Sequence, residues 1–223
     1  MKSITQNLKK LQSKLSKNKK INLVVVTKTR SEKEIEEAID AGATSIGENR
    51  VQEAEKKFSK IRNINKVEKR LIGGLQSNKA KKATNIFDVI DSVDSLRLAK
   101  KISDAAKQIN KKQRVLIQIN SSGEKTKSGF LLEEKEKILK CAENANIEIE
   151  GLMTMGPNTT NKSEILKAFK QTKNLFDDLA KNHNMKMKTL SMGMSGDLEL
   201  AIQEGTTMIR VGTAIFGKRP KIV

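Results

Sequence analysis

Short apolar runs alternate with longer amphipathic stretches along the chain. The apolar runs have the length of buried strands, and each lies next to turn-forming residues. They predict eight strands, at residues 23–26, 44–46, 70–72, 89–92, 115–119, 149–153, 189–192 and 208–211. Between the strands, apolar positions recur every three or four residues, as on one face of a helix. This spacing predicts helices at 32–41, 51–58, 78–83, 95–109, 132–144, 163–181 and 198–204.

Local signals at the element boundaries agree with this assignment. Ser31 and Glu34 have the spacing of a capping box at a helix start, and Gly42 and Gly205 follow predicted helix ends. Leu8, Leu11 and Leu15 recur at helical spacing, which predicts one more amphipathic helix before the first strand.

Eight strands that alternate with seven helices, about eight strand–helix units in 223 residues, predict an α/β fold with a parallel sheet that closes into a single (β/α)8 TIM barrel, preceded by an extra N-terminal helix. The alternative is an open doubly wound sheet, but no GxGxxG motif follows the first strand. Because the chain has only two prolines and no linker-like stretch, we expect one domain over residues 1–223.

Composition narrows the classes of function. The net charge of +18 invites nucleic-acid binding, but the lysines are spread over nearly every predicted helix, and Trp and Tyr are absent. We therefore expect no specific nucleic-acid partner. No apolar run could span a membrane and no signal peptide is evident, and the single Cys141 fits a reducing cytoplasm. The one histidine, His183, cannot form a multi-histidine metal site, so we expect no bound metal. We also expect a cytoplasmic protein and a monomer.

The first predicted strand is followed by Lys28, which is an unusual residue at the end of an apolar run. Strand side chains alternate between faces, so Val24, Val26 and Lys28 point the same way if the strand continues to Lys28. A lysine among apolar side chains gives up its proton more readily, and a neutral amine forms a Schiff base with an aldehyde. The alternative is a lysine that simply reaches solvent.

Two segments near the end of the chain have the features of a phosphate site. SMGMSGD, with Ser191 and Ser195, leads directly into a predicted helix, and RVGTAIFG places Gly212 and Thr213 after the last strand. Backbone N–H groups and hydroxyls bind anions, and many barrels bind phosphate after strands seven and eight. The alternative is that these small residues only pack at the barrel rim.

Arg210 and Asn49 complete the set of candidate residues. Arg210 shares a strand face with Met208 and Gly212, so it points into the site if that face is inward, and otherwise it forms a structural salt bridge. Asn49 follows the second predicted strand, where its neutral amide suits a ring oxygen or a carbonyl.

Seven motifs follow one another in order and cover nearly the whole chain. They are VVTKT, GENRVQEA, IGGLQSNKAKK, QINSSGEKTKSGF, GLMTMGP, LSMGMSGDLELAI and RVGTAIFG. With these motifs the chain resembles the pyridoxal-phosphate homeostasis protein family, which is similar to the barrel domain of bacterial alanine racemase without its second domain.

The resemblance implies a role for each candidate residue. Lys28 would carry pyridoxal 5'-phosphate as a Schiff base, with Asn49 beside the cofactor. Ser195, Gly212 and Thr213 would hold the phosphate with Ser191 as a neighbour, and Arg210 would face the pyridine nitrogen. Family members often have a histidine just before the sequence hydrophobic–Ile–Gly of the third strand. This chain has Arg70 at that position, and we expect it to be one more basic residue at the rim.

The resemblance also implies a cofactor carrier rather than an established enzyme. A cation opposite the pyridine nitrogen disfavours ring protonation, which damps carbanion chemistry. The related racemases use a tyrosine from their second domain as an opposite-face base, and this chain has no tyrosine. We therefore expect no catalytic residue, a role in vitamin B6 and amino-acid homeostasis, and recipient apoenzymes as partners. The alternative is an active racemase or lyase on small amino acids.

Overall fold

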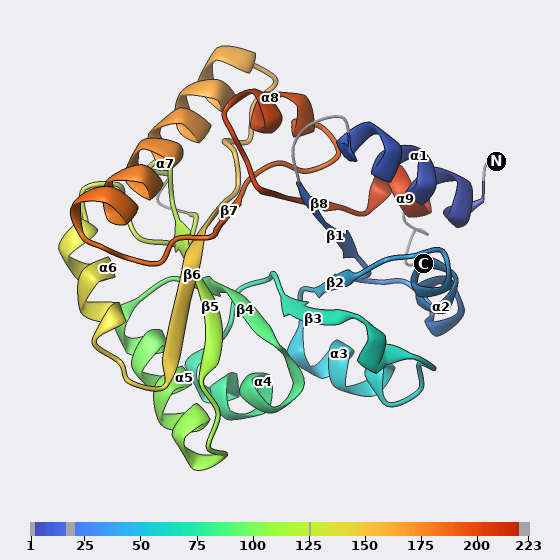
Figure 1. Ribbon diagram of the computed structural model, residues 1–223, viewed down its shortest axis with the longest axis horizontal. Helices are drawn as coiled ribbons and strands as arrows, with labels where there is room; N and C mark the ends of the chain where they lie inside the picture. Colours follow the sequence, from blue (N-terminus) through green and yellow to red (C-terminus); the bar gives the residue numbers. More distant parts are fainter. Residues whose placement is uncertain (1–2, 17–20, 125, 219–223) are drawn as a thin grey trace.

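A computed structural model describes residues 3–16, 21–124 and 126–218, so Lys125 of the predicted fifth-strand motif lies outside the described residues. The described strands pair in parallel in chain order, and β8 returns to pair with β1 (Figure 1). The strands are β1 Asn22–Val26, β2 Ser45–Glu48, β3 Glu68–Leu71, β4 Val89–Val93, β5 Gln113–Ile119, β6 Ile147–Thr154, β7 Thr189–Ser191 and β8 Met208–Val211. The predicted eight-stranded barrel is confirmed.

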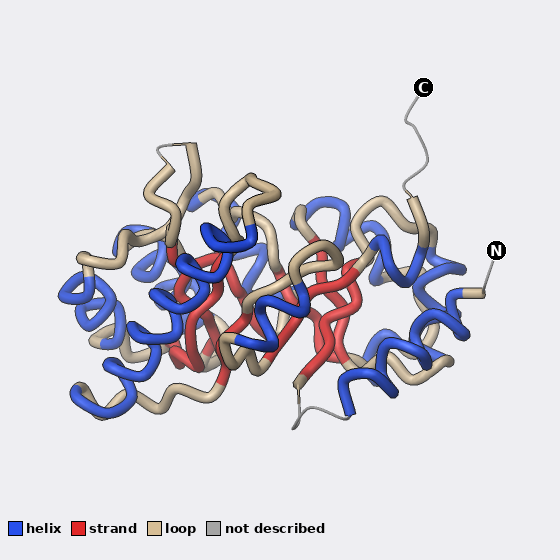
Figure 2. Tube along the Cα trace, turned by 90° about the horizontal axis from the view of Figure 1, so that it is seen from above, coloured by secondary structure: helices blue, strands red, loops and turns tan. Residues whose placement is uncertain are grey.

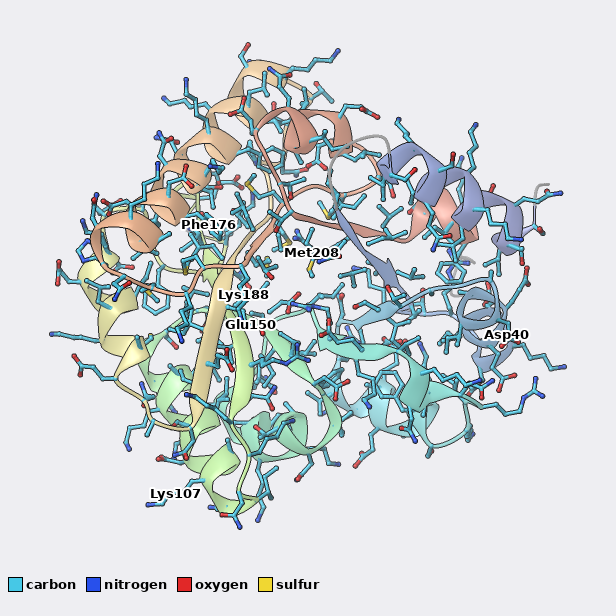
Figure 3. All side chains as sticks on the ribbon, viewed as in Figure 1. Asp40, Lys107, Glu150, Phe176, Lys188 and Met208 are labelled. Carbon is cyan, nitrogen blue, oxygen red and sulfur yellow. The ribbon has the colours of Figure 1, made fainter. Side chains whose placement is uncertain are left out.

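Helices cover the outside of the barrel (Figure 2). They are α1 Ile4–Ser16, α2 Glu32–Asp40, α3 Val51–Phe58, α4 Ala80–Ile86, α5 Leu96–Gln108, α6 Lys135–Ala142, α7 Lys162–Asn182, α8 Leu198–Gln203 and α9 Thr213–Phe216, with 3-10 turns at Ile64–Lys66 and Ser77–Lys79. Their apolar faces pack against the strands, while charged residues such as Asp40 and Lys107 project outward (Figure 3). None of the described helices combines the length and apolar character that crossing a membrane requires.

Most predicted boundaries agree with the structure to within a few residues. Ser31 caps α2 in a complete capping box with Glu34, as predicted. Cys141 is a fully buried core residue of α6, and burial raises the pKa of its thiol to about 12, so it remains protonated and unreactive at neutral pH.

The two ends of the described chain meet beside the barrel. Helix α1 packs against α2 and against the short α9, which follows β8 directly (Figure 1). The side-chain amide of Asn7 donates a hydrogen bond of 2.9 Å to the carbonyl of Ile215 in α9. The extra N-terminal helix therefore supports the turn after the last strand.

Arg70 does not lie at the rim, so that prediction is wrong. It is the third residue of β3, and its side chain is only 2% exposed. Its guanidinium binds the fully buried Asp91 of β4, with Nη2 at 2.9 Å from Oδ1, and also contacts Glu68. Burial opposes the charge of Arg70, but Asp91 and Glu68 outweigh this effect and raise its pKa above the ordinary value. A partner on the neighbouring strand therefore allows a charge inside the barrel.

Candidate functional site

A cavity of about 200 Å³ lies at the carboxyl ends of β1, β7 and β8. It brings together five of the seven predicted cofactor-binding residues. The described residues that line it are Val26, Lys28, Arg30, Met194, Ser195, Gly196, Arg210, Gly212 and Thr213. Asn49 and Ser191 are not among these lining residues. The location fits the rule that active sites of such barrels gather where the strands end.

Lys28 lies in a turn rather than in a strand. β1 ends at Val26, and Lys28 occupies a half-buried position two residues later. The next residue, Thr29, has a φ of 61°, in the left-handed region that β-branched residues rarely adopt. Such strain costs roughly 1–3 kcal/mol and persists only where surrounding contacts enforce it. The expected continuation of the strand is therefore corrected, although Lys28 still reaches the cavity.

Two turns form the opposite part of the cavity wall. Residues 194–196 follow β7 and lead into α8, while residues 212–213 follow β8 and begin α9. A hydrogen bond of 3.4 Å from the backbone N–H of Ala214 to Ser195 Oγ joins the two turns. Ser195 and Thr213 are exposed, so their hydroxyls are available to a ligand. Together these turns have the polar groups that bind a phosphate.

Gly212 allows a close approach between the last and first strands. A Cβ at this position would lie 3.1 Å from the carbonyl oxygen of Val26 and 3.3 Å from its Cβ. The glycine thus lets the turn after β8 lie directly against the end of β1. This contact brings the Thr213 turn to the same cavity as Lys28.

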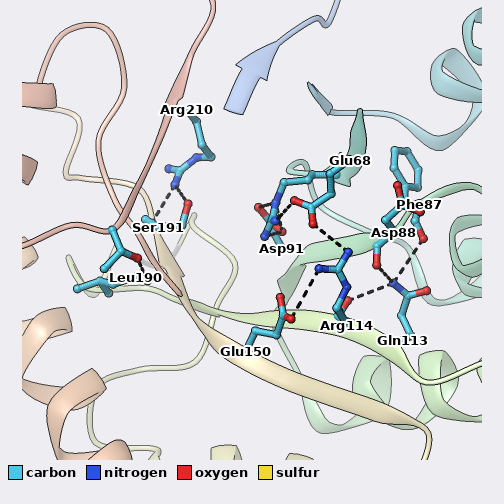
Figure 4. A network of polar contacts seen from close by, with 12 residues as sticks. Glu68, Phe87, Asp88, Asp91, Gln113, Arg114, Glu150, Leu190, Ser191 and Arg210 are labelled. Atoms are coloured by element: carbon cyan, nitrogen blue, oxygen red, sulfur yellow. Dashed lines mark hydrogen bonds and ion pairs between the residues drawn. The ribbon is translucent and has the colours of Figure 1, made fainter. Parts of the chain in front are cut away.

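Arg210 provides a fixed cation in the wall of the cavity. Its side chain lies inside the barrel and is 4% exposed. Nη1 donates to the carbonyl and hydroxyl oxygens of Ser191, the latter at 2.7 Å (Figure 4). Nη2 donates to the Thr154 carbonyl at 2.9 Å. Burial lowers the pKa of Arg210, yet an arginine keeps its charge in proteins. Of the two alternatives for Arg210, the structure therefore shows the inward orientation, and Ser191 holds its guanidinium.

Arg30 is a cavity residue that the sequence analysis missed. It is 7% exposed, its Nη2 donates to the Gly217 carbonyl at 2.7 Å, and its guanidinium lies 5.2 Å from the centre of the Phe216 ring. These contacts fasten the turn that carries Lys28 to the last residue of α9 and to Gly217, which follows it. The only available signal was its position two residues after Lys28, which does not reveal its distant partners.

Asn49 follows β2 and is half-buried. The backbone of Gly73, in the loop after β3, passes so close that an added Cβ would lie 2.4 Å from the Asn49 carbonyl oxygen. A side chain at residue 73 would displace Asn49. Gly73, the first glycine of the IGG motif, therefore allows the loop after β3 to pack directly against the Asn49 backbone.

The residues around the cavity form an electropositive site. Lys28, Arg30 and Arg210 all line it, and no carboxylate is among its described lining residues. The primary amine is a nucleophile for an aldehyde, and the two turns offer hydroxyl and backbone groups to an anion. The site thus fits a small anionic aldehyde.

The chain is similar to known proteins over most of its length. Residues 1–220 match the model of the alanine racemase N-terminal domain family. The pyridoxal phosphate homeostasis protein of Synechocystis is 40% identical over 200 residues, covering 89% of this chain and 92% of that protein.

Solved structures agree on the fold. PipY of Synechococcus elongatus, solved with pyridoxal phosphate bound, is 33% identical with a TM-score of 0.88, covering 96% of this chain and all of that chain; its structure without the cofactor gives a TM-score of 0.91. Clostridium difficile alanine racemase is 18% identical, and its TM-score of 0.78 supports the fold alone; the match covers 97% of this chain and 58% of that chain.

Proposed function

Because the chain belongs to the pyridoxal phosphate homeostasis protein family, we propose that it binds pyridoxal 5'-phosphate in the cavity between β1, β7 and β8 and acts in vitamin B6 and amino-acid homeostasis. The observation that carries the proposal is the presence of the Lys28 amine and the Ser195–Thr213 turns in the wall of one cavity. Transfer of the cofactor to recipient apoenzymes and a monomeric state remain predictions.

Each residue has a role in this proposal. As a neutral amine, Lys28 adds to the aldehyde carbon, and two hydrogens of the amine leave with the aldehyde oxygen as water, so that a C=N bond replaces C=O. Ser195, Gly212 and Thr213 hold the phosphate, and Asn49 lies beside the ring.

Arg210 faces the pyridine nitrogen, and Ser191 acts by orienting Arg210 rather than by touching the phosphate. Pyridoxal phosphate supplies an electron-accepting ring when bound. A permanent cation beside the ring nitrogen disfavours its protonation, so this chain holds the ring in its less reactive form. This arrangement suits a protein that stores or carries the cofactor.

Borohydride reduction tests the proposal directly. The full chain is incubated with pyridoxal phosphate, its absorbance is recorded, and the sample is reduced and mapped by peptide mass spectrometry. We expect a Schiff-base absorbance band and a stable pyridoxyl group on Lys28. An adduct confined to surface lysines, or distributed at random among them, would contradict the assignment.

Replacement of Gly212 by valine tests the phosphate site. The new side chain would meet Val26 and fill the space through which the turn approaches the phosphate, so we expect the affinity for pyridoxal phosphate to fall on the order of tenfold or more. Pyridoxal, which lacks the phosphate, should lose much less affinity. Equilibrium dialysis of both ligands measures the difference.

Gly74→Val is the matched control, because a Cβ at Gly74 would meet nothing within 4 Å. It should bind both ligands as the original chain does. An equal loss of pyridoxal and pyridoxal phosphate in Gly212→Val would indicate general damage rather than a lost phosphate contact.

A further inference from the structure

The turn that carries Lys28 is held from outside the barrel by charged residues that do not line the cavity. The backbone N–H of Thr27 donates to the Gly47 carbonyl at 2.9 Å, and its hydroxyl donates to Glu48 Oε1 at 2.8 Å. The Thr27 carbonyl accepts a hydrogen bond of 3.0 Å from Lys57 Nζ. The residue before Lys28 is therefore fixed through its N–H, its side chain and its carbonyl.

The residue after Lys28 is fixed by a single carboxylate. The backbone N–H of Thr29 donates to Glu53 Oε1 at 2.7 Å. This bond holds Thr29 in its left-handed conformation, which a threonine does not adopt without enforcing contacts. Glu53 belongs to α3, so a helix determines the direction in which the turn points Lys28.

Lys57 connects both contacts. Lys57 follows Glu53 by one turn of α3, and its ammonium lies 2.6 Å from Glu53 Oε1. The same ammonium lies 3.1 Å from Oε1 of Glu48, the last residue of β2. Its side chain is 12% exposed and that of Glu48 is fully buried. Burial acts to raise the pKa of Glu53, but the Lys57 and Thr29 hydrogen bonds outweigh it and hold that pKa below the ordinary value. Glu53 is therefore a charged acceptor at neutral pH.

We infer that Glu53, anchored by Lys57, is a positioning residue that presents the Lys28 amine to the aldehyde of a bound cofactor. The inference rests on the proposed function and assigns a role to GENRVQEA, the motif that also supplies Asn49. Glu53 acts through the Thr29 backbone and touches no ligand. Its loss slows covalent attachment while the phosphate and ring contacts remain.

The test compares two ligands that differ at one carbon. Pyridoxal phosphate carries the aldehyde, whereas pyridoxine 5'-phosphate carries an alcohol there and cannot form a Schiff base. Cofactor-free full-length chains are mixed with pyridoxal phosphate in a stopped-flow instrument, and the Schiff-base absorbance gives the rate of attachment. Equilibrium dialysis gives the affinity for pyridoxine phosphate.

Three variants on α3 separate positioning from general damage. Glu53→Ala removes the acceptor for Thr29, and we expect attachment to slow by about tenfold to a hundredfold, with pyridoxine phosphate affinity unchanged. Glu53→Gln keeps an oxygen for the Thr29 N–H and should recover most of the rate. Glu55→Ala, which removes an exposed carboxylate paired with Lys82, should behave as the original chain.

The possible outcomes are distinct. A Glu53→Ala protein that attaches the cofactor as fast as the original chain would overturn the inference, as would a parallel loss of pyridoxine phosphate affinity. A Gln variant as slow as the Ala variant would also overturn it, because positioning would not depend on the Thr29 bond. If the original chain forms no Schiff base, the proposed function itself fails.

Discussion

Lys28→Ala is expected to abolish the covalent attachment of pyridoxal phosphate and to leave the barrel intact. The substitution removes the only amine side chain among the described lining residues of the cavity. The fold should survive because Lys28 is half-buried in a turn, and because hydrogen bonds of Thr27, Thr29 and Arg30 also hold that turn. After incubation with cofactor and borohydride, intact mass should show no pyridoxyl adduct above background, while circular dichroism and thermal unfolding stay unchanged.

Lys56→Ala provides the control for nonspecific labelling, because Lys56 is an exposed residue of α3 next to Lys57 in the sequence. This variant should keep the full adduct. A Lys28→Ala protein with as much adduct as the Lys56→Ala protein would show that another lysine carries the cofactor.

Racemisation of alanine or serine by the cofactor-loaded protein is expected to be very slow. The reaction removes a proton on one face of the substrate carbon and returns one on the other, and each well-placed acid or base contributes about 10²–10⁴-fold. The titratable groups among the described lining residues are Lys28, Arg30 and Arg210. The two arginines stay protonated and do not act as bases, so Lys28 is the one candidate base among these residues. Turnover should fall far below the roughly 1–10³ per second of ordinary enzymes.

Chiral chromatography of alanine and serine incubated with the loaded protein measures this turnover. Lys28→Ala serves as the blank, since free cofactor also racemises amino acids slowly. Turnover in the ordinary range that disappears in Lys28→Ala would replace the carrier interpretation with the alternative of an active racemase or lyase.

The fold was largely predictable because hydrophobic spacing specifies it locally. Each predicted strand overlaps one observed strand, since buried parallel strands are short apolar runs. The four-residue helix α9 was not predicted, because four residues after Gly212 are too few to show a helical period. The start of α4 was also misplaced, because a 3-10 turn at Ser77–Lys79 precedes it.

The candidate site was predictable only in part, because several of its features depend on contacts distant in sequence. Lys28 and the two turns could be assigned to the site from their positions after strands, and Arg210 from the face that it shares with Met208 and Gly212. The left-handed Thr29 carries no local signal, since its conformation is enforced by Glu53 from α3. Arg70 was placed wrongly because its partner Asp91 is 21 residues away, and spacing alone does not reveal such a pair.

The closure of the barrel between β1 and β8 also has a consequence for the synthesis of the protein. Lys28 is made early, whereas Thr213 and the turn beside it are made near the end of the described chain. The Asn7–Ile215 hydrogen bond, which spans 208 positions, likewise needs both parts. Contacts this distant in sequence form late, because the intervening chain must first be ordered. A growing chain on the ribosome therefore exposes Lys28 without its phosphate site, and the cavity forms only after the last strand has emerged and paired with the first.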